Sequence, residues 1–319
     1  MATNDTQERP PDEAPYQRSR SVRALKLSLL LAVGFLVVEA LGGYLTNSLA
    51  LIADAGHLLT DVGALVLALA AIWVARRPAG PDRTYGNLRV EVLAAFANGL
   101  MLLLIAAWVA YEGYRRLWAP PEVKSVAMVS IATAGLVANV AMMGLLRSPA
   151  RESLNARAAY IHVATDALQS VGLIVGGVLM VLFRWYVADP IVSMVIAVFM
   201  TWTGVRIVVA ALRIMMDVAP AHIDVPKLRE ALESVDGVKE VHDLHVWTVT
   251  SGFDTMSAHI VLKDGLPAEE ARRALAQMRH IAVHDFCVEH ATIQVEDWAV
   301  RCPDDLSPDA RALRQREFI

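Results

Sequence analysis

Residues 48–75 read SLALIADAGHLLTDVGALVLALAAIWVA, and this stretch decides the fold. An α-helix needs roughly 20 mostly apolar residues to cross a bilayer, and this run exceeds that length. Three ionisable side chains, Asp54, His57 and Asp61, interrupt its first half. Ionisable groups at membrane depth are costly and usually face the inside of a helix bundle, where they have a function. The stretch therefore predicts a membrane helix with one chemically active face.

The rest of the chain extends this pattern. Of its 319 residues, 55% are hydrophobic and only 19% are charged, whereas a soluble domain carries about 25% charged residues. The charge deficit is concentrated between about residues 25 and 212, and both ends are polar. The mild net charge of −4 argues against a nucleic-acid partner. Six apolar runs are predicted to be membrane helices, at about 25–45, 48–75, 90–113, 125–146, 153–183 and 190–212.

The polar ends divide the chain further. We expect a disordered tail over residues 1–24, a six-helix transmembrane domain over 25–212, a soluble domain over 213–297 and a C-terminal tail over 298–319. We expect no cleavable signal peptide, because residues 1–20 are polar and contain no apolar run. Arginine and lysine are most frequent before the first run and in the second and fourth loops, which predicts that both termini are cytoplasmic.

A second polar motif matches the first. His162 and Asp166 in the fifth run repeat the H-x-x-x-D spacing of His57 and Asp61. Residues four apart lie on one face of a helix, so each helix offers one imidazole nitrogen and one carboxylate oxygen. Two such helices supply four ligands that suit tetrahedral Zn²⁺, and Co²⁺ or Cd²⁺ also fit. The alternative for either copy is a chance spacing in which His and Asp only pair with each other.

The motifs at residues 47–61, 83–99 and 155–170 together resemble signatures of the cation diffusion facilitator family. The resemblance extends from about Leu25 to Glu296. It implies a homodimeric metal/proton antiporter in the membrane, with a cytoplasmic metal-binding domain, whose transported ion binds His57, Asp61, His162 and Asp166. The His-plus-Asp form is similar to zinc-transporting members. The loop at residues 147–152 lacks the His-rich insert of many eukaryotic relatives. We expect a bacterial inner-membrane protein.

The polar C-terminal part has its own pattern. Helical periodicity at 225–235 and 268–283, with strands at 238–249, 253–262 and 290–296, predicts a ferredoxin-like αββαβ fold. A tight reversal at Thr250-Ser251 places His242 opposite His259, close enough to share a metal. Alternation along the strand points His245 to the other face.

The resemblance adds Glu296 as a third ligand beside His242 and His259, with His222 and Gln294 as weaker candidates. The alternative is that these histidines are simply solvated, and that interpretation suits His280, His284 and His290 best. The roles of two further acidic residues remain open. Glu39 is expected to relay protons, bound the ion path or pair within the bundle, and Asp54 to line the approach or orient a ligand.

These features predict an antiporter that exports Zn²⁺ from the cytoplasm by alternating access and takes protons as counter-ions. Two other classes stay open. A metal-dependent membrane enzyme needs an open coordination position on its metal and further groups that bind a substrate. The two H-x-x-x-D pairs together fill all four positions around a tetrahedral ion, so we expect no enzyme. A membrane-bound metal sensor does not need polar pairs in the middle of two membrane helices, so these pairs favour a transporter over a sensor.

Overall fold

The computed structural model describes residues 32–75, 80–147 and 154–296. The predicted tails at 1–24 and 298–319 lie outside the described residues. The chain divides into two compact units, Met1–Ile72 with Ala94–Val208, and Trp73–Leu93 with Val209–Ile319. Each unit is described below on its own.

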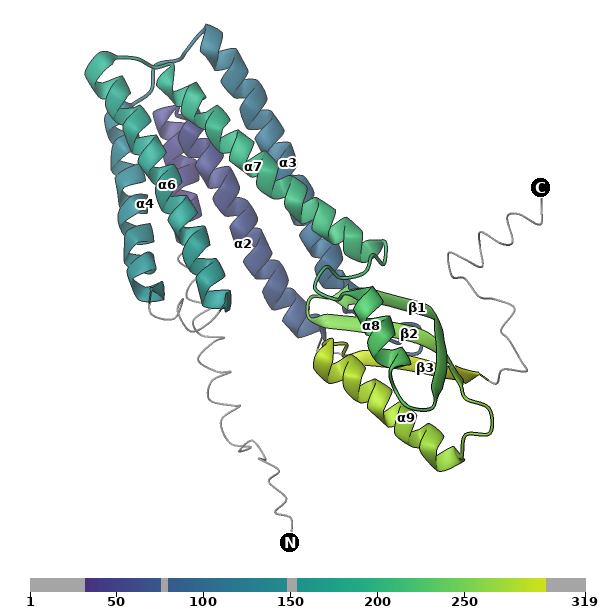
Figure 1. The fold of residues 1–319 in the computed structure, drawn as a ribbon. Coiled ribbons are helices and arrows are strands. Elements are labelled where there is room, and N and C mark those ends of the chain that lie inside the picture. The colour runs from purple at the N-terminus through teal and green to yellow at the C-terminus, as the bar shows by residue number, and fades with distance from the viewer. Residues whose placement is uncertain (1–31, 76–79, 148–153, 297–319) are drawn as a thin grey trace, which may run out of the picture. The chain divides into compact units, whose positions relative to one another are not determined.

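The first unit is a bundle of long helices (Figure 1). In the described part of the chain, five helices are long and apolar enough to cross a membrane, and a shorter apolar helix covers Ala32–Thr46. The five are α2 (Leu49–Ala75), α3 (Arg89–Trp118), α4 (Ser125–Leu146), α6 (Leu154–Phe183) and α7 (Ala188–Met215). They match the five later predicted runs, and Ala32–Thr46 falls on the first. The chain is a multi-pass membrane protein.

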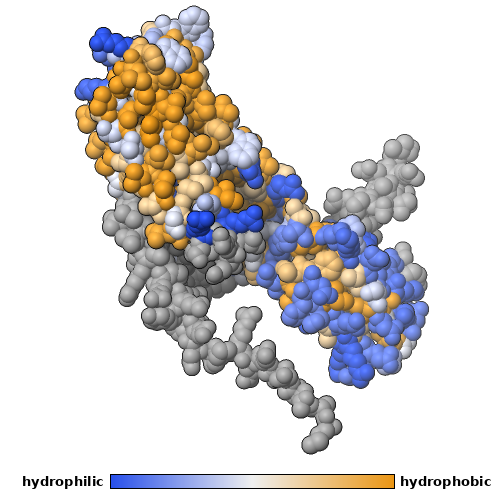
Figure 2. Space-filling view, turned by 60° about the vertical axis from the view of Figure 1, so that its left-hand side comes forward, coloured by the Kyte–Doolittle hydropathy of each residue, from blue (hydrophilic) through white to orange (hydrophobic). Residues whose placement is uncertain are grey.

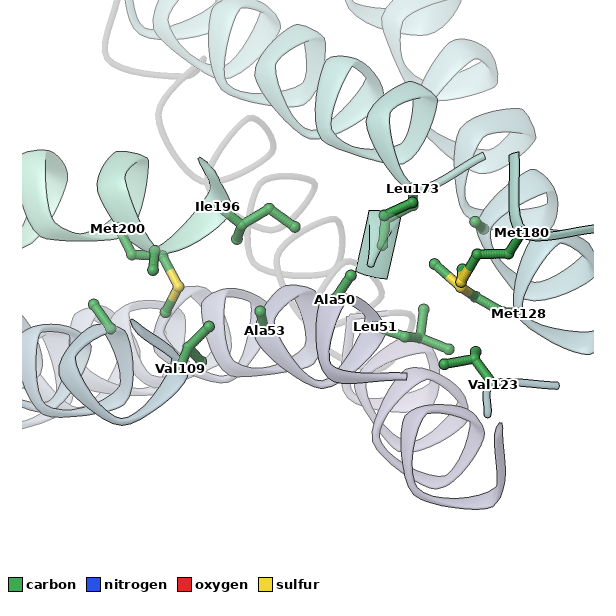
Figure 3. Close-up of a cluster of buried hydrophobic side chains, with 14 of the residues drawn as sticks. Ala50, Leu51, Ala53, Val109, Val123, Met128, Leu173, Met180, Ile196 and Met200 are labelled. Atoms are coloured by element: carbon green, nitrogen blue, oxygen red, sulfur yellow. The ribbon is translucent and has the colours of Figure 1, made fainter. Parts of the chain in front are cut away.

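Apolar side chains cover both the inside and the outside of these helices. A buried cluster of small and medium-sized side chains joins them, and ten of its members are labelled in Figure 3, among them Leu51, Met128 and Leu173. On the outer surface, Leu104, Leu145 and Phe183 are exposed, and Figure 2 shows this part of the molecule covered mostly in hydrophobic residues. A helix that is apolar on all sides is typical of a membrane span.

Glycines allow helices of the bundle to approach closely. A Cβ at Gly99 of α3 would lie 2.9 Å from Val208 Cγ2 on α7, and a Cβ at Gly204 of α7 would lie 2.9 Å from Leu103 Cδ2 on α3. Small residues at such crossings are the usual means of packing helices where no hydrophobic effect drives them together.

A buried aspartate caps the start of α2. Asp189, on the first turn of α7, accepts hydrogen bonds from Ser48 Oγ at 2.6 Å, Leu49 N at 2.8 Å and Ala50 N at 3.2 Å. Ser48 Oγ also accepts from Leu51 N at 3.2 Å. The first amides of a helix have no partner within it, and in lipid water cannot supply one. The Ser48–Asp189 pair therefore fixes both the start of α2 and its position against α7.

The second unit contains a small α/β domain, and the predicted αββαβ order is confirmed. Its elements are α8 (Val225–Glu233), β1 (Val238–Thr250), β2 (Phe253–Leu262), α9 (Ala268–His280), the π-helical turn η1 (Ile281–Asp285) and β3 (His290–Glu296). The three strands of the described sheet are in the order β1-β2-β3, with β1 antiparallel and β3 parallel to β2. Leu228, Leu232 and Met278 from the two helices lie in its buried core.

The loop before α3 and the first turn of α3 pack on this domain within the second unit. The Tyr85 ring meets Phe253 and His290 edge-on, with centroids 6.4 and 6.2 Å apart. Thr250 Oγ1 donates a hydrogen bond of 2.8 Å to a carboxylate oxygen of Glu91. These contacts join the end of the β1–β2 hairpin to the start of α3.

The α2 cap gives a first test. Replacing Asp189 with Ala leaves the amides of Leu49 and Ala50 without an acceptor, at about 1–3 kcal/mol for each buried donor. We expect the purified variant to lose several degrees of thermal stability in detergent. The matched control is Ser193→Ala, on the same helix, whose hydroxyl only donates to the Asp189 carbonyl at 2.7 Å. Equal melting temperatures for both variants would contradict the role given to the Asp189 carboxylate.

Candidate metal centres

Four side chains from α2 and α6 converge in the first unit, and we call His57, Asp61, His162 and Asp166 the helix cluster. Within each helix, Nε2 of the histidine lies 3.9 Å (His57–Asp61) or 3.8 Å (His162–Asp166) from an aspartate oxygen. Between helices the separations are 3.7 Å for His57–Asp166 and 3.6 Å for His162–Asp61. Each imidazole nitrogen thus lies between two carboxylates, one on its own helix and one on the other.

These separations are too long for hydrogen bonds. They are close to what a metal needs, because ligands with bonds of about 2.0–2.2 Å around a tetrahedral ion lie roughly 3.3–3.6 Å apart. The two rings meet edge-on, with centroids 6.1 Å apart and planes inclined by 78°. The structure brings together all four residues that the sequence motifs predicted, in an alternating N, O, N, O arrangement that a small inward movement closes around one cation.

A cavity of about 50 Å³ adjoins the helix cluster. Its lining includes His57, Asp61 and Asp166, together with Glu39 from the first helix and Asp54 from α2. Glu39 is almost completely buried. The two acidic residues whose roles the sequence left open, Glu39 and Asp54, therefore lie beside the helix cluster and line the same small polar cavity. Asn139 and Ser170 complete the polar part of the wall.

Three side chains converge in the α/β domain, and we call His242, His259 and Glu296 the sheet cluster. Each offers a ligand atom within 4.8 Å of the other two. The Glu296 carboxylate lies between the rings, 3.2 Å from His242 Nε2 and 2.8 Å from His259 Nδ1. The ring centroids are 5.5 Å apart. The donor set of two nitrogens and one carboxylate fits a zinc-type ion and leaves room for a further ligand.

The predicted pairing of His242 with His259 is confirmed, but the hairpin turn is not where it was predicted. Thr250 pairs with Phe253, so the turn residues are Ser251 and Gly252 rather than Thr250 and Ser251. Irregularities in β1 compensate for this difference and restore the His242–His259 pairing. Gly252 has a φ of 73°, a conformation that glycine adopts without strain.

The predicted orientation of His245 is wrong. A bulge in β1 between His242 and His245 shifts the pairing, so that His245 faces Ser257, two residues before His259 on the regular strand β2. Directly paired residues share a face, so His245 lies on the same face as His242 and His259. The bulge contains Asp243, with a φ of 49°. Its carboxylate lies 2.8 Å from His245 Nε2 and 3.8 Å from His259 Nε2.

Asp243 was therefore not predicted from the sequence. The one sign of it is that an aspartate, a residue type that tolerates positive φ, occurs within a predicted strand. The two weaker candidates for this cluster, His222 and Gln294, make other contacts. His222 pairs with Asp254 at 2.8 Å. The Gln294 amide donates to Glu296 Oε1 at 3.0 Å and so orients that carboxylate.

Apolar membrane-spanning helices with a His/Asp cluster, followed by an α/β domain with a His/Glu cluster, define a membrane protein that handles transition-metal cations. Residues 25–216 match the family model of the cation efflux transmembrane domain, and residues 220–298 match that of the cation efflux protein cytoplasmic domain. The chain belongs to the cation diffusion facilitator family.

Three relatives show how far the similarity extends. The chain is 37% identical to the cadmium, cobalt and zinc/H(+)-K(+) antiporter of Bacillus subtilis, over 95% of this chain and 97% of the relative. It is 37% identical to the metal cation efflux system protein CzcD of Cupriavidus metallidurans, over 86% of each chain. It is 35% identical to the zinc transporter ZitB of Escherichia coli, over 89% of this chain and 90% of the relative.

The sheet cluster gives a second test. Replacing Glu296 with Ala removes the carboxylate that lies against both histidines, so we expect zinc affinity at this site to fall by at least about tenfold. The measurement is zinc titration of the full chain in detergent, in an Asp61→Ala/Asp166→Ala background that removes the helix cluster. The control is Glu240→Gln, which changes a carboxylate on β1 outside the cluster. Unchanged affinity in the Glu296 variant would rule out metal binding at these residues.

Proposed function

We propose that this protein exports Zn²⁺ across the cell membrane in exchange for protons, and that the helix cluster binds the transported ion. One observation carries the proposal. Two imidazole nitrogens and two carboxylates alternate at 3.6–3.9 Å between α2 and α6, inside membrane-spanning helices. The names of the three relatives, each an antiporter, an efflux protein or a zinc transporter, support the same function.

Exchange follows from the chemistry of the ligands. A divalent ion needs both carboxylates ionised and both imidazoles neutral, so metal and protons compete for the same atoms. Histidine titrates near physiological pH, which makes His57 and His162 the natural carriers of the counter-proton. Protons that enter from outside then displace the metal outward, and the emptied site returns to the cytoplasm to bind the next ion.

Zinc is the proposed main substrate, with Co²⁺ and Cd²⁺ as further substrates. A mixed set of two nitrogens and two oxygens suits these ions, whereas Mg²⁺ and Ca²⁺ prefer shells made only of oxygen. The relative in Bacillus subtilis is named for cadmium, cobalt and zinc, and that in Escherichia coli for zinc alone.

The proposal includes the setting of the protein. We propose a bacterial inner-membrane protein with a membrane domain over residues 25–212 and a cytoplasmic domain over residues 213–297. The basic loops favour cytoplasmic termini. We propose a homodimer, in keeping with the match to the family's cytoplasmic-domain model. The sheet cluster then binds cytoplasmic zinc and serves regulation or stability rather than transport.

The experiment that tests transport is zinc uptake into proteoliposomes under an imposed pH gradient. Asp61→Ala and Asp166→Ala each remove a carboxylate that lies near both imidazoles, so we expect gradient-driven uptake to fall to the level of protein-free vesicles in both variants. Asp82→Ala is the control, because Asp82 is exposed in the loop between α2 and α3. We expect its uptake to equal that of the unaltered protein.

The same assay separates the rival function. A sensor binds metal without moving it, so the unaltered protein would show zinc binding but no uptake at any pH gradient. Normal uptake in folded Asp61→Ala and Asp166→Ala proteins would place the metal path elsewhere in the bundle.

A further inference from the structure

The end of α9 brings two exposed histidines into contact outside both clusters. His280 is the last residue of α9, and His284 lies four residues later in the π-helical turn η1. Their ring centroids are 4.3 Å apart, with the planes inclined by 40°. Both residues are exposed. Nothing in the sequence distinguishes them from ordinary solvated histidines, whereas in the structure they form a pair.

The π-helical turn explains how close the rings are. The backbone N–H of Phe286 donates to the Ile281 carbonyl at 3.3 Å, five residues back, in place of the α-helical bond four residues back. This wider turn changes the position of His284 relative to the preceding turn of α9. Single π-helical turns inside or beside α-helices are rare and are frequent at functional sites.

We propose that His280 and His284 form a further site for a divalent transition metal such as Zn²⁺. Two histidines four residues apart on one helical face are a recurrent pair of zinc ligands. Nitrogens bound to one metal at about 2.0–2.1 Å lie roughly 3.3 Å apart in tetrahedral geometry, which rings 4.3 Å apart reach by small rotations of the side chains. Imidazole suits zinc, copper and nickel, and does not suit Mg²⁺ or Ca²⁺.

The character of this site differs from that of the two clusters. The sheet cluster has a buried carboxylate between its histidines, whereas the only groups that define the His280–His284 site are two exposed rings. Water completes the shell, with the exposed Asp285 as the adjacent acidic group. A site with two protein ligands and open positions binds metal weakly and releases it readily. It therefore acts as an exchange site on the surface of the α/β domain rather than as a structural one.

The test is zinc protection of individual histidines in the full chain in detergent. Diethyl pyrocarbonate modifies exposed neutral imidazoles, and mass spectrometry measures the modification of each histidine separately. We expect added Zn²⁺ to slow modification of His280 and His284 together, with one shared half-maximal concentration. His222 is the internal control, because it is exposed and outside the clusters, so its rate should stay unchanged over the same zinc range.

Two variants complete the experiment. A shared metal needs both rings, so in His284→Ala zinc should no longer protect His280, and in His280→Ala zinc should no longer protect His284. Both side chains are exposed, so neither substitution touches the core, and an unchanged His222 rate shows that its ion pair with Asp254 is kept in each variant. Protection of His280 that persists in His284→Ala, or rates for both histidines that follow His222 at all zinc concentrations, would overturn the proposal. Neither result bears on transport, which depends on other residues.

Discussion

Two carboxylates and two imidazoles lie together inside an apolar bundle, separated by 3.6–3.9 Å and so not hydrogen-bonded to one another. Such a group cannot keep its two negative charges without a compensating cation, because an uncompensated charge in the membrane costs several kcal/mol. A divalent metal neutralises both carboxylates at once, and so do protons. In the proposed function, this need to neutralise the helix cluster makes metal and protons exclusive alternatives.

The rest of the bundle holds α2 and α6 where that competition is possible. The helix cluster depends on α2, and the start of α2 is fixed by the acceptors of Ser48 and Asp189. Along α6, Gly177 lets the chain approach Val129 of α4 more closely than any larger residue would. One helix is therefore positioned by polar capping and the other by close packing. Both devices suit a membrane, where hydrophobic burial does not distinguish one helix neighbour from another.

Periodicity in the sequence was sufficient to predict the helices and the residues of the helix cluster, because a spacing of four residues fixes two side chains on one helical face. It could not predict that the shorter contacts run between helices, from His57 to Asp166 and from His162 to Asp61. Nor did it reveal Asp189, since a cap supplied by a distant helix leaves no local pattern.

The α/β domain shows the same limit more sharply. The alternation of β1 predicted the His242–His259 pair, but a single inserted residue reverses the face of everything beyond it. The bulge at Asp243 thus put His245 on the face that alternation excluded. The π-helical turn at 281–285 is equally invisible in sequence, and only the structure shows that it pairs His280 with His284.

The sheet cluster also has a mechanical connection within its unit. Its ligand atoms all lie within 4.8 Å of one another, and the Glu296 carboxylate lies 3.2 Å from His242 Nε2 and 2.8 Å from His259 Nδ1. His242 and His259 lie on the two strands of one hairpin, and that hairpin ends at Thr250, which donates to Glu91 on the first turn of α3. The hairpin that carries two of the three cluster residues is therefore held to the first turn of α3 by a hydrogen bond within the same unit.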